Sequence, residues 1–303
     1  MKTKILLTGG SGLIGSYFVD KFSKKFGSNL VISPTHRQMD ITNLDSIKRY
    51  FDLHQPESVI HFAAFRDATE AEKQRGNKND LVWKVNVEGS KNISKAVQKY
   101  NCYLIHISTD YVFSGSKKNP GPYSEKDEPR DSSRLLSWYG FTKREAERVI
   151  QDRLNNAAIL RICNITRPKN DPRLDYIGKI LWLYDHKKIY PMFDDQYLTL
   201  TFIPTLVDLI IKLLKSKTTG VFHVSTKNIV TPQKLANYLI EQMYGLKNEI
   251  RGISINSYLK SNPRRYPKFG GLMTDLTEKK LGLKFKTWQE AVNFYLKDIN
   301  KKK

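Results

Sequence analysis

The sequence predicts an α/β protein built on a doubly wound, mostly parallel sheet, with a smaller C-terminal lobe. Two observations carry this prediction. Short apolar strands alternate with amphipathic helical segments, as they do in successive βαβ units. Several of the strands are continuous apolar runs, which is typical of strands that helices cover on both faces.

The alternation can be followed from the N-terminus through most of the chain. The predicted strands are Lys4–Thr8, Asn29–Ser33, Ser58–Phe62, Tyr103–Ser108, Ala158–Ile162 and Val221–Val224. The predicted helices of the first half are Leu13–Phe26, Leu44–Leu53, Leu81–Tyr100 and Tyr139–Leu154. Strands followed by helices in this order predict βαβ units and a mostly parallel sheet.

The regular alternation ends near residue 163. The next segment, NITRPKNDPRLD, is polar and holds two prolines, so we predict a loop there. Helices are predicted at Tyr176–His186, at Pro204–Lys215 and in PQKLANYLIEQM, where Thr231 is the expected N-cap. We therefore predict two domains. The first comprises residues 1–165 with about 198–226, and the second comprises residues 166–197 and 227–303.

Composition limits the classes of function. The chain of 303 residues has 51 Lys plus Arg against 30 Asp plus Glu, which gives a formal net charge of +21. Such a charge would attract nucleic acid or a phosphorylated small molecule. The basic residues are scattered, however, and lack the interleaved aromatic residues of a base-stacking surface. A nucleic-acid partner is therefore not expected.

The sequence also lacks the signals of a membrane, secreted or metal-binding protein. No segment approaches the roughly 20 apolar residues of a membrane-spanning helix, and the apolar run at the N-terminus is too short for a secretory signal. Cys102 and Cys163 do not have metal-site spacing and are expected to be small buried side chains. We expect a cytoplasmic protein with no membrane partner and no metal.

The segment TGGSGLIG, at residues 8–15, joins the first strand to the first helix. Glycines here permit a tight turn, a close approach of the backbone to a pyrophosphate, and packing of the helix on the strand. The phosphates then lie at the N-terminus of the helix. The segment predicts a Rossmann-type site for a nicotinamide dinucleotide in the first domain.

The end of the second predicted strand bears on the choice between NAD and NADP. An acidic residue that would bind a ribose 2′-hydroxyl is missing there, and the sequence is Ser33-Pro34-Thr35-His36-Arg37 instead. A basic side chain at this point can bind a 2′-phosphate, so Arg37 favours NADP. The alternative is that Arg37 is solvated and that the chain accepts NAD as well.

Tyr139 and Lys143 in YGFTK are four residues apart and share one face of a predicted helix. A nearby lysine favours a phenolate, so we expect Lys143 to lower the pKa of Tyr139 toward a useful acid–base value. Thr109 lies about thirty residues earlier, at the carboxyl end of the fourth strand. Ligands bind at that edge of open α/β sheets, and a hydroxyl group there can bind a substrate oxygen.

These motifs together resemble those of the extended short-chain dehydrogenase/reductases. Within that group the chain is similar to the dTDP-4-dehydrorhamnose reductases (RmlD-type) and their sugar-nucleotide relatives. The matching segments are TGGSGLIG, Asp40-Ile41, HFAAF at 61–65, VNVEGSKNI at 85–93, ISTDYVFSG at 107–115 and PYSEKDEP at 122–129. Later segments, DDQYLTLTFIPTLVDLI and NPRRYPKFGGLMTDLTEKKLGL, extend the resemblance over nearly the whole chain.

The resemblance implies a reductase of a nucleotide-linked 4-keto sugar that uses NADPH. It implies catalytic roles for Thr109, Tyr139 and Lys143, in which Tyr139 protonates the carbonyl oxygen and Lys143 binds the nicotinamide ribose. It also implies cofactor contacts, in addition to Tyr139, Lys143 and Arg37, from Gly9, Ser11, Gly12, Leu13, Ile14, Asp40, Ile41, Ala63, Ala64 and Phe65. Substrate contacts are expected from Thr109, Asp110 and Asn164.

Two departures from the family pattern concern the substrate. Asn164 stands where rhamnose-forming reductases usually have an aromatic residue that packs on the sugar. Arg66, in the altered stretch FRDATEAEKQRGNK, is expected to point toward an anionic substrate. The identity of the sugar and of its nucleotide therefore stays open.

Other functions are compatible with the same motifs. An NAD-dependent sugar-nucleotide epimerase needs the same three residues, whereas dehydratases add an acid–base pair after the threonine, and Tyr111 is not acidic. A non-catalytic regulatory subunit with this fold, such as that of methionine adenosyltransferase, is a third reading. Family members commonly pair through the helices that correspond to Leu81–Tyr100 and Tyr139–Leu154, so a homodimer is a possible assembly.

Overall fold

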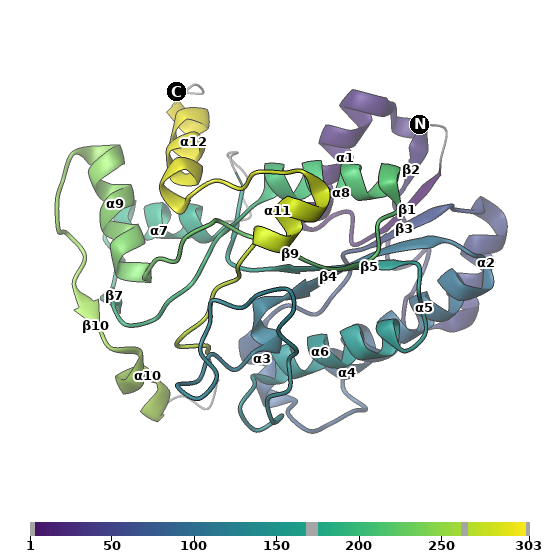
Figure 1. Ribbon diagram of the computed structural model, residues 1–303, viewed down its shortest axis with the longest axis horizontal. Helices are drawn as coiled ribbons and strands as arrows, with labels where there is room; N and C mark the ends of the chain where they lie inside the picture. The colour runs from purple at the N-terminus through teal and green to yellow at the C-terminus, as the bar shows by residue number, and fades with distance from the viewer. Residues whose placement is uncertain (1–3, 168–174, 262–265, 301–303) are drawn as a thin grey trace. The chain divides into compact units, whose positions relative to one another are not determined.

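The computed structural model describes residues 4–167, 175–261 and 266–300 (Figure 1). Residues 168–174 of the predicted loop and residues 262–265 of the segment NPRRYP lie outside these ranges. The chain divides into two compact units. The first consists of Met1–Val112, Leu136–Arg161 and Val207–Phe222, and the second of Phe113–Leu135, Ile162–Leu206 and His223–Lys303.

A six-stranded sheet forms the centre of the first unit. Its order is β2-β1-β3-β4-β5-β9, and the pairs β1–β2, β1–β3 and β3–β4 are parallel. The bounds are Ile5–Thr8 (β1), Val31–Ile32 (β2), Ser58–His61 (β3), Tyr103–Thr109 (β4), Ala157–Ile162 (β5) and Gly220–Val224 (β9). The order reverses between β1 and β3, so the predicted doubly wound parallel sheet is confirmed.

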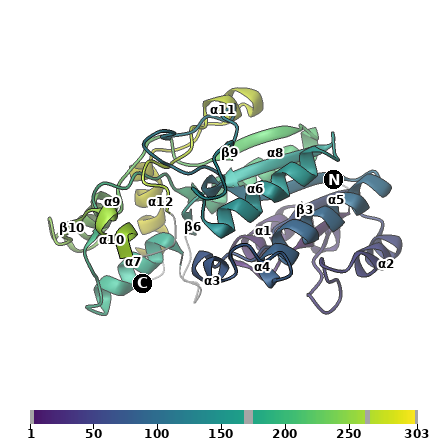
Figure 2. The ribbon, with the colours of Figure 1, turned by 90° about the horizontal axis from the view of Figure 1, so that it is seen from below.

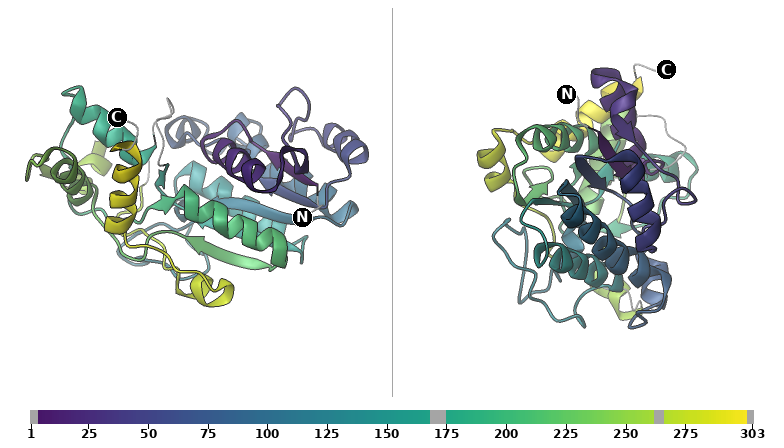
Figure 3. Two further views of the ribbon diagram at one scale, coloured as in Figure 1. Left: turned by 90° about the horizontal axis from the view of Figure 1, so that it is seen from above. Right: turned by 90° about the vertical axis from the view of Figure 1, so that its right-hand side faces the viewer.

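Helices cover both faces of this sheet. Figure 2 shows α2 (Leu44–His54), α5 (Gly89–Lys99) and α6 (Trp138–Gln151) along one face. The left view of Figure 3 shows α1 (Leu13–Phe26) and α8 (Ile203–Ser216) on the other face. The core under α2, α5 and α6 is apolar and includes Leu6, Val59, Leu104, Phe51, Ile93 and Ile150. Burial of this kind of surface stabilises the fold by about 25 cal/mol per Å².

The predicted continuous helix Leu81–Tyr100 is interrupted in the structure. It is divided into α4 (Leu81–Trp83), a π-helical turn (Lys84–Glu88) and α5. Within the turn, the Asn86 side chain binds the backbone of Phe65 instead of pointing to solvent. Such π turns insert one residue into a helix and are frequent near functional sites, and apolar periodicity alone does not reveal them.

Short elements complete the first unit. They are two 3₁₀ turns, Ser28–Leu30 and Asp110–Val112, and the helix α3 (Ala68–Lys73). The N-cap of α3 is Asp67, whose carboxylate accepts hydrogen bonds from the amides of Thr69 and Glu70. None of the helices in the described ranges is long and apolar enough to cross a membrane.

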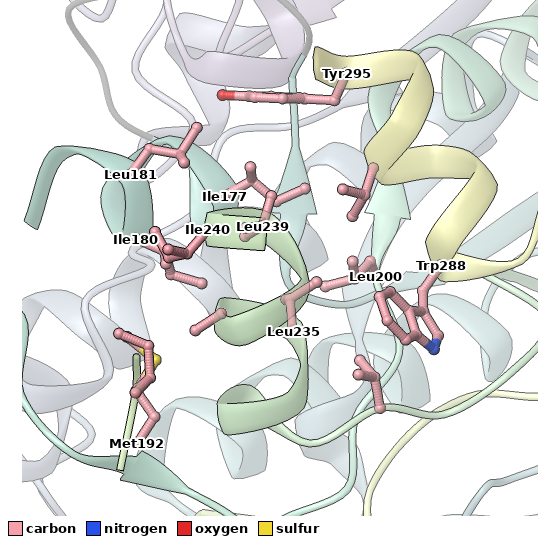
Figure 4. Close-up of a cluster of buried hydrophobic side chains, with 14 of the residues drawn as sticks. Ile177, Ile180, Leu181, Met192, Leu200, Leu235, Leu239, Ile240, Trp288 and Tyr295 are labelled. Carbon is pink, nitrogen blue, oxygen red and sulfur yellow. The ribbon is translucent and has the colours of Figure 1, made fainter. Parts of the chain in front are cut away.

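The second unit has its own core, shown in Figure 4. Three helices contribute most of it: α7 (Tyr176–Asp185), α9 (Pro232–Tyr244) and α12 (Trp288–Asn300). Thr231 is the N-cap of α9, as predicted, and accepts a hydrogen bond from the amide of Lys234. The other elements are β6 (Ile165–Thr166), β7 (Met192–Phe193), β8 (Thr201–Phe202), β10 (Gly252–Ile253), α10 (Ile255–Ser261) and α11 (Asp275–Leu281).

The segment 113–135 belongs to the second unit, whereas the sequence prediction placed it in the first domain. Its backbone pairs with residues 269–273. The Tyr123 amide donates to the Gly271 carbonyl at 2.9 Å, and the Met273 amide donates to the Tyr123 carbonyl at 2.7 Å. This pairing joins segments about 150 residues apart in the chain, a long-range contact that local composition does not encode.

Candidate active site

The glycine turn after β1 is as tight as its sequence requires. Gly9 has a φ of +72°, and a Cβ atom there would lie 2.7 Å from the backbone nitrogen of Ala63. A Cβ atom on Gly15 would overlap the carbonyl oxygen of Gly9, so helix α1 rests directly on the turn. Side chains at either position would separate the turn from β3 or from α1.

The N-terminus of α1 is open for an anion. Gly12 is the N-cap and provides no side-chain cap, and the first turn of the helix holds no acidic residue. Ser11 and Gly12 are exposed, Ile14 is half-buried, and Leu13 is buried against the core. Backbone N–H groups at such a helix end bind phosphate through hydrogen bonds and the helix dipole. These residues therefore fit the pyrophosphate of a dinucleotide.

The end of β2 lies beside the same turn, because a Cβ atom on Gly10 would overlap the Ser33 hydroxyl. Arg37, four residues after Ser33, is exposed. The Asp40 carboxylate accepts hydrogen bonds from the amide and the hydroxyl of Thr42, both at 2.8 Å. Ile41 is buried. Asp40 thus closes a turn of the chain, and its predicted contact with the cofactor stays a prediction.

The loop after β3 contains the predicted cofactor contacts Ala63, Ala64 and Phe65, all half-buried. The Asn86 carboxamide accepts from the Phe65 amide at 2.8 Å and donates to the Phe65 carbonyl at 3.1 Å. Its nitrogen also donates to the Thr142 hydroxyl at 3.0 Å. Asn86 therefore holds this loop in place from the π-helical turn.

At the carboxyl end of β4, Thr109 and Asp110 are both buried. The Thr109 hydroxyl donates to the Asp110 carboxylate at 3.1 Å and accepts from the Tyr111 amide at 3.3 Å. Burial raises the pKa of Asp110 to about 7, although the bond from Thr109 opposes this shift. The pair presents a hydroxyl and a carboxyl group at the edge where the sheet binds ligands.

Helix α6 brings Tyr139 to this edge. Ser137 is the N-cap and accepts a hydrogen bond from the Gly140 amide at 3.0 Å. A Cβ atom on Gly140 would overlap the carbonyl oxygen of Tyr111, so the first turn of α6 packs directly on the 3₁₀ turn after β4. The rings of Tyr111 and Tyr139 meet edge to face with centroids 6.1 Å apart.

The expected lowering of the Tyr139 pKa by Lys143 is wrong for this structure. The pKa of Tyr139 is raised to about 12, first by burial and then by the negative charge of Asp110. The Thr109 hydroxyl and the charge of Arg66 only partly offset this. The four-residue spacing reveals the lysine on the same helix face, but it does not reveal the carboxylate at the end of β4. Tyr139 is consequently protonated throughout the neutral pH range.

Lys143 is buried, and its ammonium group points to β4. The ammonium donates to the Ile107 carbonyl at 2.6 Å and lies 3.2 Å from Nε2 of His106. Burial lowers the pKa of Lys143 to about 8, and the nearby carboxylate of Glu147 opposes the shift. Thr109, Tyr139 and Lys143 therefore gather around the carboxyl end of β4.

Sequence reasoning did not single out Asn86, His61 or His106. Both histidines are buried, and His61 is the last residue of β3. A signal was present, because each of the apolar segments VIHF and LIHIS is interrupted by a histidine. Buried polar groups require hydrogen-bond partners, so a histidine in an apolar strand indicates a specific contact at that position.

Asn164 belongs to the second unit, at the corner between β5 and β6. Its φ is +34°, a conformation that asparagine tolerates better than most residues. Its side-chain nitrogen donates to the Thr199 carbonyl at 3.0 Å. The residue thus stabilises the corner, and its contact with a substrate stays a prediction. Cys102 and Cys163 are both buried free thiols, as expected.

Known proteins resemble this chain over nearly its whole length. The family model "RmlD substrate binding domain" matches residues 3–301. The spore coat polysaccharide biosynthesis protein SpsK of Bacillus subtilis is 28% identical over 296 residues, 98% of each chain. A dTDP-4-dehydrorhamnose reductase from Clostridium acetobutylicum superposes with a TM-score of 0.84 and 26% identity, over 98% of this chain and 99% of that one.

A second solved structure has the same fold. The dTDP-4-dehydrorhamnose reductase of Bacillus anthracis, determined in complex with NADP, superposes with a TM-score of 0.85 over 98% of this chain and 99% of that chain, at 23% identity. The family match spans both units and includes the glycine turn and the tyrosine–lysine helix. The chain belongs to the RmlD substrate-binding domain family.

Proposed function

We propose that the chain is an NADPH-dependent reductase of a nucleotide-linked 4-keto sugar. One observation carries the proposal. Thr109, Asp110, Tyr139 and Lys143 meet at the carboxyl end of β4, in the same sheet as a glycine turn whose helix end is open for a pyrophosphate. The relatives named above, among them a reductase of dTDP-4-dehydrorhamnose at 26% identity, support the substrate class.

The residues of the first unit fit a bound NADPH. Its pyrophosphate would lie on the turn formed by Gly9, Ser11 and Gly12 and on the first amides of α1, next to Leu13 and Ile14, while Ala63, Ala64 and Phe65 would flank it further along. Lys143 would bind the nicotinamide ribose. When bound, the cofactor supplies a hydride to the carbonyl carbon of the sugar.

Tyr139 supplies the proton in this proposal. A pKa of about 12 keeps its hydroxyl protonated at neutral pH, so it can donate to the carbonyl oxygen as negative charge develops there. Thr109 orients the same oxygen by a hydrogen bond, with Asp110 beside it. Asn164 is a further proposed contact of the sugar nucleotide. We further propose a cytoplasmic homodimer that pairs through the segments Leu81–Tyr100 and Tyr139–Leu154.

The direct test is a substrate screen. The purified full-length chain is incubated with NADPH and a panel of dTDP- and UDP-linked 4-keto sugars, and loss of NADPH absorbance is followed with product analysis. Reduction of at least one sugar to the 4-hydroxy product is the expected result. Turnover without net NADPH loss, with NAD retained through purification, would identify an epimerase. Tight NADPH binding with no turnover of any sugar would favour a regulatory subunit.

Cofactor choice gives a second prediction. Changing Arg37 to Ser should raise the KM for NADPH about 10- to 100-fold, because one charged hydrogen bond contributes about 1.5–3 kcal/mol. The KM for NADH should stay the same, since NADH lacks the 2′-phosphate. Arg49→Ser, at another exposed arginine of the first unit, is the control. An equal change for both cofactors, or a wild-type preference for NADH, would contradict the role of Arg37.

A further inference from the structure

A row of polar side chains crosses the sheet below the site. Thr8 on β1 is in register with His61 on β3, and His61 is in register with His106 on β4. In-register residues of parallel strands point to the same face of a sheet. Here that face is covered by α5 and α6, because His61 contacts Ser90 and His106 contacts Lys143. All of these side chains are buried.

Hydrogen bonds fix the tautomer of His61. The Ser90 hydroxyl donates to the Asn86 carbonyl at 2.7 Å, so it accepts from Nε2–H of His61 at 3.3 Å. Nδ1 of His61 must then accept, and its partner is the Thr8 hydroxyl at 2.7 Å. The Thr8 oxygen in turn accepts from the Ala63 amide at 3.2 Å. The donor and the acceptor are thus defined in every hydrogen bond of this series, and the His61 imidazole is neutral.

His106 has the opposite arrangement. A lysine ammonium has only donors, so Nε2 of His106 accepts from Lys143 at 3.2 Å and the ring proton is on Nδ1. Among the described residues, Nδ1 has no hydrogen-bond partner. The rings of His61 and His106 lie 5.3 Å apart, tilted by 37°. The His106 ring therefore leaves its Nδ1–H without a hydrogen-bond partner in the described part of the chain, while its Nε2 accepts from Lys143.

We propose that His106 is a positioning residue for Lys143, and that its Nε2, together with the Ile107 carbonyl, fixes the lysine ammonium below Tyr139. His61, held by Thr8 and Ser90, supports the His106 ring from the side. The proposal rests on the proposed function in one respect, namely that Lys143 acts in the reaction. It gives a positioning role to His61 and His106, neither of which takes part directly in hydride or proton transfer.

The electrostatics of the site agree with this assignment. Burial, followed by the charge of Lys143, lowers the pKa of His106 well below its usual range and that of His61 to about 3. Both rings therefore stay neutral, and His106 remains an acceptor. The other charged group that acts on Lys143 is Glu147, which forms a buried ion pair with Arg161 at 2.8 Å. Burial destabilises the Lys143 ammonium, and the neutral acceptors His106 Nε2 and Ile107 carbonyl, with the Glu147 carboxylate, oppose that effect.

A spectrum of the wild-type chain tests the geometry without any enzyme assay. Long-range ¹H–¹⁵N correlations of ¹⁵N-histidine distinguish the two tautomers of each of the six histidines. His106→Gln and His61→Gln variants assign the signals. We expect His106 as the Nδ1–H form and His61 as the Nε2–H form at neutral pH, and we expect Lys143→Met to shift the His106 signals. An Nε2–H or a charged His106 would overturn the proposal.

Kinetics then test the consequence. His106→Leu should lower kcat about 10- to 100-fold, the scale of loss when a reacting group is displaced by about 1 Å. It should also move the alkaline limb of the kcat–pH profile to lower pH, because an ammonium that loses an acceptor deprotonates more easily. His106→Gln should restore both values substantially, since its carbonyl oxygen can accept from Lys143.

The matched control is His223→Gln, at a buried histidine of β9 whose Nδ1 lies 3.0 Å from the Met273 carbonyl. It should keep the wild-type kcat and pH profile. A wild-type profile in His106→Leu, or the same profile change in His223→Gln, would overturn the proposal. If the wild-type chain reduces no sugar while the histidine tautomers are as expected, the proposed function fails and the positioning of Lys143 stands.

Discussion

Replacing Tyr139 by phenylalanine should lower kcat for sugar reduction by about 100- to 10,000-fold, the usual contribution of a positioned general acid. The phenyl ring keeps the edge-to-face contact with Tyr111, so the fold and the binding of NADPH should not change. The variant removes only the hydroxyl, which is the proton donor to the sugar oxygen in the proposed function. The measurements are steady-state kinetics and NADPH fluorescence titration.

The control for this variant is Tyr103→Phe. Tyr103 is buried on β4 like the site residues, but at the amino end of the strand, where its hydroxyl binds the Thr218 carbonyl. Loss of that hydroxyl should leave kcat at the wild-type value. If Tyr139→Phe retained wild-type reduction, another group would have to supply the proton, and the proposed role of Tyr139 would be wrong.

The second large effect is expected for Gly9→Ala. The new methyl group would meet the Ala63 backbone at 2.7 Å, and the residue would keep a φ of +72°. The turn must then move away from β3, which misdirects the amides that would bind the pyrophosphate. Loss of one or two such bonds, at about 1.5–3 kcal/mol each, should weaken NADPH binding about 100-fold or more.

Gly245→Ala separates the effect of φ from the effect of contact. Gly245 has a φ of +74°, nearly that of Gly9, but a Cβ atom there would meet nothing within 4 Å. This variant should lose about 1–2 kcal/mol of stability from the left-handed conformation alone and should bind NADPH like the wild type. Calorimetric titration and thermal unfolding of both variants are the measurements. Equal NADPH affinities in the two variants would contradict the prediction.

The sheet could be predicted because its information is local. Helix α1 begins and ends where the sequence predicts, and β4 and β5 differ from prediction by one residue at an end. The apolar runs define the strands, and the glycine turn defines the first crossover. The same reasoning also identified Tyr139 and Lys143 as neighbours on α6, since a spacing of four residues fixes a helix face.

What escaped prediction depends on contacts between distant segments. The raised pKa of Tyr139 comes from burial and from Asp110, which is 29 residues earlier in the chain. The π-helical turn at Asn86 depends on the backbone of Phe65, and the row of Thr8, His61 and His106 depends on strand register. Local propensity cannot supply these facts, because each is a property of elements that meet only in the folded chain.

The Asn86 carboxamide has a mechanical consequence. It binds the Phe65 backbone and the Thr142 hydroxyl, and Thr142 precedes Lys143 in α6, about one helical turn after Tyr139. The loop after β3 and the tyrosine helix are therefore coupled through this amide group, in addition to the packing of Phe65 and Tyr139 against one hydrophobic cluster. Under the proposed function, the loop that would flank the hydride donor and the helix that would carry the proton donor are therefore joined to each other by hydrogen bonds of one side chain.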